Sequence, residues 1–154
     1  MRPSDYGRRV SSLDSFAALA GHVNYLAVVS TLRADATIQS SLVNVGLVQS
    51  PLDQTSVLGF VTYGKVKLAN LRARPQVTVT AYAGWRWKTI EGRSVIVGPD
   101  DPHPEVDAER LRLLLREVFV AAGGQHDDWD QYDRVMREER RAAVLVTPTR
   151  LYPR

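Results

Sequence analysis

The spacing of apolar and polar residues divides the chain into segments with helical periodicity and segments with strand-like patterns. Apolar positions three or four residues apart predict helices over residues 12–22, 65–72, 108–122 and 129–141. Runs rich in β-branched residues, or with strict alternation, predict strands. These strands cover residues 25–32, 37–49, 56–62, 76–82, 86–97 and 142–147.

Short connections join most of the predicted strands, so the sheet should be mainly antiparallel. Six strands of this length tend to close into a small barrel, because an open sheet leaves exposed edges. The two helices predicted before the last strand do not fit a doubly wound parallel fold. The pattern therefore predicts a mainly β protein with helices (α+β), built on a six-stranded antiparallel barrel.

Length and composition indicate one globular domain. The 154 residues are 44% hydrophobic and 24% charged, and no repeat or linker divides them. We expect a single domain over residues 1–154, with residues 1–11 as a flexible N-terminal segment. The absence of cysteine excludes a disulfide scaffold, a thiolate metal site and a cysteine nucleophile. Without a secretory signal or a run of about 18 apolar residues, we expect a cytoplasmic protein with no membrane partner.

The chain contains far more arginine than lysine. The net charge of +3 is too small to indicate nucleic-acid binding by itself. Of the 20 basic residues, 17 are arginine, a bias typical of GC-rich genomes. Two of the three lysines, Lys65 and Lys67, stand only two positions apart.

Motifs for several common kinds of active site are missing. The three histidines are far apart in the sequence and form no metal-binding spacing, so we assign no metal site. No nucleophile elbow, dinucleotide-binding glycine motif or phosphate-binding Walker loop occurs. We therefore assign no side chain as a catalytic acid, base or nucleophile.

The segment from Thr62 to Arg72 carries the clearest chemical signal. A strand ends there, Gly64 provides a turn, and a short helix begins with Lys65 and Lys67. Backbone N–H groups at a helix start, together with two ammonium groups, can hold a phosphate. Spacing alone leaves a second interpretation open, in which both lysines belong to a solvated helix end.

Several short motifs resemble the pyridoxamine 5'-phosphate oxidase-like flavin and deazaflavin oxidoreductases. They are Val29-Ser30-Thr31-Leu32-Arg33-Ala34-Asp35, the pattern Lys67-x-x-Asn70-Leu71-x-x-x-Pro75-x-Val77, and Glu91-Gly92. Residues 124–132 and 140–142 resemble the actinobacterial branch that uses coenzyme F-420. The resemblance spans about residues 14–152, and it implies an FMN-binding type of split β-barrel. It also implies a homodimer with cofactor sites between the subunits.

The resemblance implies roles for particular residues. Lys65 and Lys67 match the basic residues that bind the cofactor phosphate, and Asn70 matches the asparagine that follows them. Ser41 and Asn44, on the second predicted strand, would lie near the cofactor ring. Two further residues, Thr62 and Tyr63, would lie along the cofactor. Trp85 matches a tryptophan that either closes the cleft, from its own or the partner chain, or packs in the dimer core.

The function implied by the resemblance is an F-420-dependent oxidoreductase. Such an enzyme transfers a hydride between the deazaflavin and a small organic substrate, and its proton comes from Tyr63, water or solvent. An FMN-dependent oxidase or reductase is the alternative within the same family. We expect the acidic tail of F-420 to bind a basic rim that contains Arg72 and Arg74.

Two other classes of function remain open from the sequence. One is a non-catalytic protein that stores or presents the cofactor. The other, a nucleic-acid-binding barrel, would need an aromatic and basic face, for which residues 82–88 are the candidates. We expect a small-molecule substrate and no nucleic-acid partner. Because residues 57–61 carry apolar side chains on both faces, we also expect a second subunit to cover one of them.

Overall fold

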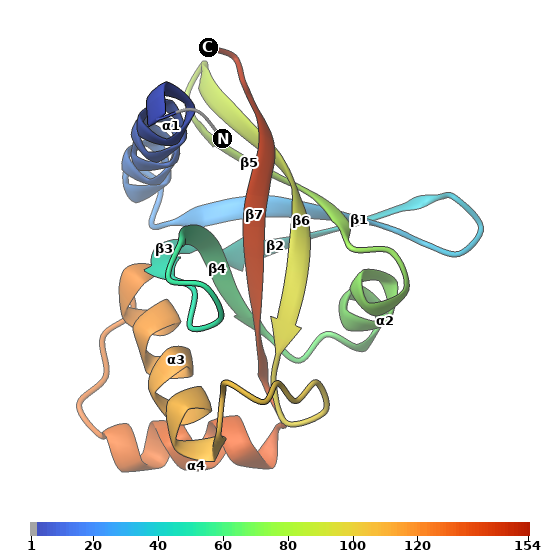
Figure 1. Cartoon of the computed structure of the whole chain (residues 1–154), viewed down its shortest axis with the longest axis vertical. Helices are drawn as coiled ribbons and strands as arrows, with labels where there is room; N and C mark the ends of the chain where they lie inside the picture. Colours follow the sequence, from blue (N-terminus) through green and yellow to red (C-terminus); the bar gives the residue numbers. More distant parts are fainter. Residues whose placement is uncertain (1–2) are drawn as a thin grey trace.

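The computed structural model describes the backbone of residues 3–154 and the side chains from residue 12 onward. Within this range the chain forms seven strands and four helices (Figure 1). In chain order they are α1 (Pro3–Gly21), β1 (Leu26–Leu32), β2 (Ile38–Asn44), β3 (Gly46–Gln49), β4 (Ser56–Thr62), α2 (Lys65–Ala73), β5 (Gln76–Ala83), β6 (Arg86–Val97), α3 (Ala108–Ala121), α4 (Trp129–Glu138) and β7 (Ala142–Tyr152).

All seven strands belong to one antiparallel sheet with the order β2-β1-β5-β6-β7-β4-β3. The expectation of six strands closed into a barrel is wrong in two respects. The predicted strand over 37–49 is broken at Val45 into β2 and β3, which pair with different neighbours. Within the described residues no ladder joins β2 to β3, so the sheet is not closed into a barrel.

Val45 explains where the strand breaks. Its side chain is buried, and its N–H donates to the carbonyl oxygen of Tyr25 at 2.8 Å. Immediately after it, the backbone of Gly46 lies against α3, and a Cβ on Gly46 would clash with the backbone of Ala121. Only glycine allows so close an approach, so the chain passes from one sheet edge to the other at this point. Helical or alternating periodicity carries no sign of such a crossing.

The other elements follow the predicted pattern closely. The carboxylate of Asp107 accepts the N–H of Arg110 at 2.8 Å and caps α3, and Asp128 caps α4 in the same way. Strand β7 continues beyond the predicted end at Thr147, because Pro148 lies beside a bulge in β7, at Thr149, where a missing N–H is tolerated. Helix α1 begins at Pro3 rather than at residue 12, whereas the flexibility expected for residues 1–11 stays a prediction.

Two apolar clusters hold the sheet and the helices together. The larger one fills the inside of the bent sheet, with α1 against it, and includes Phe16, Leu58 and Phe60. The smaller one joins α3 and α4 to β4 and β7 through Val57, Leu115 and other residues. Both faces of the segment 57–61 are thus covered within one chain, so this segment does not require a second subunit.

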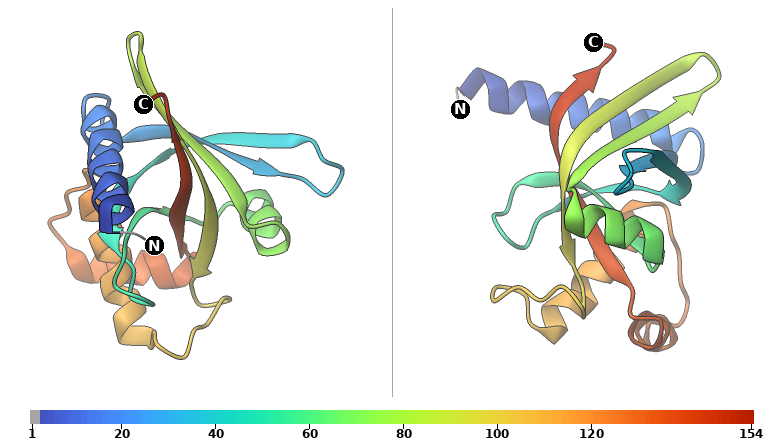
Figure 2. Two further views of the ribbon diagram at one scale, coloured as in Figure 1. Left: turned by 45° about the horizontal axis from the view of Figure 1, so that its top comes forward. Right: turned by 90° about the vertical axis from the view of Figure 1, so that its right-hand side faces the viewer.

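Two hairpins project from the body in different directions. Figure 2 shows the β1–β2 and β5–β6 hairpins pointing in different directions, while α2 contacts β1 and α1 contacts β5 and β6. Within the described residues no helix is long and apolar enough to cross a membrane.

Candidate cofactor-binding cleft

A cleft of about 850 Å³ lies where the end of β2, the β4–α2 turn, the helices α3 and α4, and the start of β7 meet. Its volume is within the range of ordinary cofactor and small-molecule sites. One wall is apolar and aromatic, and the other carries cations. The lining residues are Leu42, Val43, Asn44, Val61, Thr62, Tyr63, Gly64, Lys65, Lys67, Val118, Phe119, Ala122, Tyr132, Met136 and Arg141.

The β4–α2 turn forms the basic wall. The hydroxyl of Thr62, a buried residue, accepts the N–H of Gly64 at 3.0 Å and fixes the turn. Helix α2 then starts without a side-chain cap and without an acidic residue in its first turn. Lys65 and Lys67 stand there instead, although cations are unfavourable at the positive end of a helix dipole. This arrangement disfavours an isolated helix and favours the binding of an anion.

Lys67 is the most unusual residue of the cleft. It is only 7% exposed, and its Nζ lies 5.6 Å from the centre of the Phe60 ring. Burial lowers the pKa of its ammonium group. Among the residues whose side chains are described, no carboxylate forms an ion pair with it. A buried cation without a counter-ion is costly, so its position indicates that a ligand supplies the negative charge.

Arg141 is a third cation in the cleft, and it is not among the site residues predicted from the sequence. Its guanidinium group stacks on the ring of Tyr63, 4.3 Å from the ring centre. The same group donates to Glu139 at 2.6 Å. Arg141 immediately precedes β7, about 70 residues after the lysines, and no spacing rule could connect it with them.

The opposite wall comes from α3 and α4. The hydroxyl of Tyr132 donates to the carbonyl oxygen of Leu115 at 2.8 Å, and burial raises the pKa of this phenol to about 12. Phe119 packs on Tyr132 with ring centres 4.9 Å apart. Trp129 also packs on Tyr132, edge to face, with ring centres 5.4 Å apart. Tyr132 is therefore held as a neutral, fixed ring. Periodicity predicted both helices, but it could not show that some of their apolar side chains line a cleft.

Five of the eight residues proposed from the sequence line the cleft, namely Asn44, Thr62, Tyr63, Lys65 and Lys67. The other three do not line it in the single chain. Asn70 is buried, and its amide donates to the hydroxyl of Thr31 at 3.0 Å, which ties α2 to β1. Trp85 is 99% exposed at the end of the β5–β6 hairpin.

Ser41 is the third residue outside the lining. Its hydroxyl oxygen is buried without a hydrogen-bond partner among the described residues. This hydroxyl on β2, two residues from the cleft wall at Val43, is thus an unsatisfied polar group inside the described part of the chain.

Arg72 and Arg74 do not form the expected basic rim. Arg72 is engaged in two hydrogen bonds to Asp101, at 2.6 and 2.9 Å, and Nε of Arg74 donates to the carbonyl oxygen of Leu32. Neither residue lines the cleft. Both arginines therefore fasten α2 to neighbouring segments.

No family model matches the sequence. The fold is similar to that of several solved structures. One is a conserved hypothetical protein of Mycobacterium tuberculosis, with 20% identity, a TM-score of 0.60, and coverage of 88% of this chain and 81% of that one. A second is an F420 reductase, with 19% identity, a TM-score of 0.57, and coverage of 84% and 90%.

A third similar structure is a pyridoxamine 5'-phosphate oxidase-related, FMN-binding protein of Nostoc punctiforme. It has 14% identity and a TM-score of 0.58, and the match covers 98% of this chain and 84% of that one. Together with the resemblance in the sequence, these matches show that the chain has the fold of the pyridoxamine 5'-phosphate oxidase-like flavin and deazaflavin proteins.

Proposed function

We propose that the protein is an oxidoreductase that binds coenzyme F-420 in the cleft and acts on a small organic substrate. The observation that carries this proposal is the buried ammonium group of Lys67 beside the uncapped start of α2. A phosphate placed there would neutralise Lys67 and accept N–H groups of the helix. The names of the two similar structures, an F420 reductase and an FMN-binding protein, support a cofactor of this type.

The residues of the cleft fit such a group without rearrangement of the turn. Lys65 and Lys67 would hold the phosphate, while the fixed ring of Tyr132 and the ring of Phe119 would support a flat apolar body. A deazaflavin supplies hydride transfer, and the role of the chain is to bind it, orient it and exclude water. The ring of Tyr63 is more than half exposed and lies at the mouth of the cleft, where its hydroxyl could donate a proton to substrate.

The preference for F-420 over FMN rests on the resemblance of residues 124–132 and 140–142 to the F-420-dependent branch, and on the similar structure named an F420 reductase. A single phosphate, which both cofactors carry, is matched by the two lysines and the helix start. Arg141 lines the cleft but already pairs with Glu139 at 2.6 Å, so it does not by itself distinguish the two cofactors.

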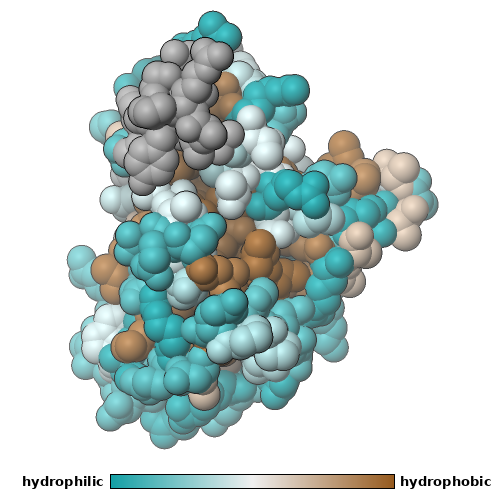
Figure 3. All heavy atoms as spheres, viewed as in Figure 1, coloured by the Kyte–Doolittle hydropathy of each residue, from teal (hydrophilic) through white to brown (hydrophobic). Residues whose placement is uncertain are grey.

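We further propose that the active form is a homodimer with cofactor sites between the subunits. Ile38 and Leu42 on β2 are exposed, as are Tyr82 and Trp87 on the β5–β6 hairpin. The strand register places these four side chains on one outer face of the sheet. Figure 3 shows apolar side chains gathered across the middle of the molecule and on the projecting β1–β2 arm. A second subunit on this face would also cover part of the exposed Trp85 at the end of the β5–β6 hairpin.

The test is a parallel titration of the purified protein with F-420 and with FMN. We expect F-420 to bind more tightly, and Lys67→Met to weaken its binding about 10- to 100-fold, because a charge-assisted contact is lost. Lys88→Met is the matched control, since Lys88 lies outside the cleft. If FMN binds more tightly than F-420, the cofactor is FMN and not F-420. If Lys67→Met binds F-420 and FMN as tightly as wild type does, the proposed role of Lys67, and with it the proposal, is wrong.

Turnover distinguishes an enzyme from a cofactor store. The loaded protein should oxidise reduced F-420 when electrophilic, unsaturated small molecules are added. Tight binding with no turnover over a broad panel of such acceptors would instead favour the non-catalytic function.

A further inference from the structure

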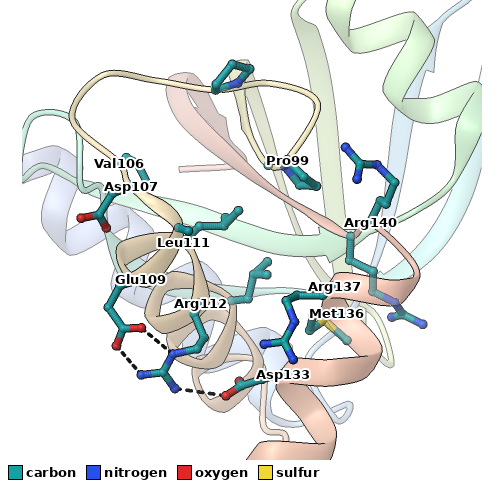
Figure 4. Close-up of a pocket in the computed structure, with 15 residues that line it drawn as sticks. Pro99, Val106, Asp107, Glu109, Leu111, Arg112, Asp133, Met136, Arg137 and Arg140 are labelled. Atoms are coloured by element: carbon teal, nitrogen blue, oxygen red, sulfur yellow. Dashed lines mark hydrogen bonds and ion pairs between the residues drawn. The ribbon is translucent and has the colours of Figure 1, made fainter.

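A second cavity, of about 560 Å³, lies between α3, α4 and the loop of residues 98–107 (Figure 4). It is separate from the basic turn of the cleft, and neither Lys65 nor Lys67 lines it. The two cavities share only Met136 and Arg141 among their lining residues. We refer to this second cavity as the α3–α4 pocket.

The inside of the α3–α4 pocket is largely apolar. Leu111 and Leu115 line it from α3, Met136 from α4, and Val106 and Pro99 from the loop. In Figure 4, Leu111 and Met136 come from different helices and face the space between them. Leu115 and Met136 are buried in the smaller core cluster, so this surface is rigid. It offers a firm contact for a ring or a short aliphatic chain.

Arginines surround this apolar surface, and most of them are already paired. Arg112 binds Glu109 and also donates to Asp133 at 3.1 Å. Arg140 pairs with Asp100 at 2.5 Å. Because these guanidinium groups are neutralised within the chain, they add little net charge to the pocket.

The lining also holds one cation and one carboxylate that have no ion pair among the residues whose side chains are described. The carboxylate is that of Asp107, which accepts the N–H of Arg110 at the start of α3 and points away from Arg137 in Figure 4. The cation is Arg137, whereas Arg141 pairs with Glu139. On the α4 side, the pocket therefore joins an apolar surface to an unpaired guanidinium group.

We propose that the α3–α4 pocket binds a small organic monocarboxylate, with its carboxylate on Arg137 and its apolar body on Leu111, Leu115 and Met136. A guanidinium group matches a carboxylate in geometry as well as in charge. A neutral apolar ligand would cover Arg137 without pairing it, and a small inorganic anion would leave the apolar surface in contact with water. Only a ligand that has both a carboxylate and an apolar body pairs with Arg137 and also covers the apolar surface.

The two methionines of the chain, Met1 and Met136, make a sensitive test possible. Labelling the methionine methyl groups with ¹³C gives two resonances, which Met136→Leu assigns. Benzoate is the probe. It should shift the Met136 resonance in a saturable manner, whereas benzamide, which lacks the charge, and acetate, which lacks the ring, should each bind at least tenfold more weakly.

Two variants of α4 provide the matched comparison. Arg137→Gln should weaken benzoate binding tenfold or more, because the paired charge is removed. Arg134→Gln changes an exposed arginine on the same helix that does not line the pocket, and it should leave the affinity unchanged. Both residues are exposed, so neither change should disturb the fold.

Three results would overturn the proposal. One is the absence of a saturable shift at Met136 up to the solubility limit of benzoate. Another is equal binding by Arg137→Gln and wild type, or equal binding of benzamide and benzoate. The third is loss of benzoate binding in Lys67→Met but not in Arg137→Gln, because the anion would then lie in the cleft. None of these results depends on whether F-420 binds, so failure here is distinguishable from failure of the proposed function.

Discussion

Burial of Lys67 affects the stability of the protein when no cofactor is bound. The residue is only 7% exposed, and no carboxylate of the described residues pairs with it. The folded state therefore disfavours the charged form, as the lowered pKa records. The same residue that is proposed to bind the ligand makes the unliganded fold less stable.

We expect Lys67→Met to raise the free energy of unfolding of the cofactor-free protein by about 0.5–2 kcal/mol near pH 7. The unfolded chain binds more protons than the folded one between the lowered pKa and the ordinary value of 10.5. The cost of burying Lys67 is thus fully present below the lowered pKa and decreases as the pH rises through it. Urea unfolding from pH 7 to pH 10 should show the difference between variant and wild type becoming smaller. A variant that is less stable than wild type at pH 7 would contradict this account.

The sequence identified the residue types of the basic wall but not their environment. Two lysines at a helix start are visible in the sequence, and the turn at Gly64 follows from residue type. Whether Lys67 is solvated or buried depends on how Phe60 and the helix pack around it. The contribution of Arg141 was out of reach for a different reason, because it joins the cleft through tertiary structure alone.

At the scale of elements, α3 and α4 are held together by packing and by one buried carboxylate. Asp133, on α4, is only 6% exposed and accepts hydrogen bonds from Arg112 and Arg116 of α3. Hydrogen bonds from Arg116 and then Arg112 lower the pKa of this carboxyl group. The apolar side of the same contact includes Leu115 and Met136.

Asp133→Asn should lower the free energy of unfolding by about 1.5–3 kcal/mol at pH 7, because charged hydrogen bonds are lost. The pKa of Asp133 is depressed, so its contribution is complete above the ordinary value of 3.8 and is lost as the pH falls through the folded value. Thermal unfolding should therefore separate variant and wild type at pH 7, and the difference should become smaller in acid. A constant difference down to pH 2 would show that the charge is not the cause.

Leu115→Ala should lower the free energy of unfolding by about 2–5 kcal/mol, because this α3 side chain is almost fully buried against α4 and the sheet. Leu113→Ala is the control on the same helix, since Leu113 is exposed. Denaturant unfolding of the two variants measures both effects. Similar midpoints for the two would show that α3 does not pack as described.

Periodicity predicted most elements to within a few residues because apolar side chains that face a common core must recur at the period of the helix or strand. It failed at residues 37–49, where two consecutive strands, separated only by Val45, belong to opposite edges of the sheet. Local patterns indicate which residues point inward, but they do not indicate which strands pair with each other. Strand pairing depends on hydrogen bonds between residues that are far apart in the sequence.

For the whole molecule, the exposed outer face of the sheet leads to a prediction about size in solution. Ile38, Leu42, Tyr82 and Trp87 should be covered by a second copy, so the protein should sediment at twice its 17.2 kDa at micromolar concentration. Leu42→Arg places a charge in the middle of this face and should shift the equilibrium toward the monomer. A wild-type protein that remains a folded monomer would refute the dimer while leaving the cleft itself intact.

The crossing at Val45 also determines where the chain tolerates a change in length. The ladder β1–β2 lies on one side of it and the ladder β3–β4 on the other, and the two are connected by a single residue. An alanine inserted after Val45 would leave each ladder intact but would displace one relative to the other. Gly46 could not absorb the displacement, because the backbone of α3 occupies the space around it. The same insertion within residues 50–55, a surface loop, should be far less damaging to thermal stability, so natural variation in length is expected in that loop and not at the crossing.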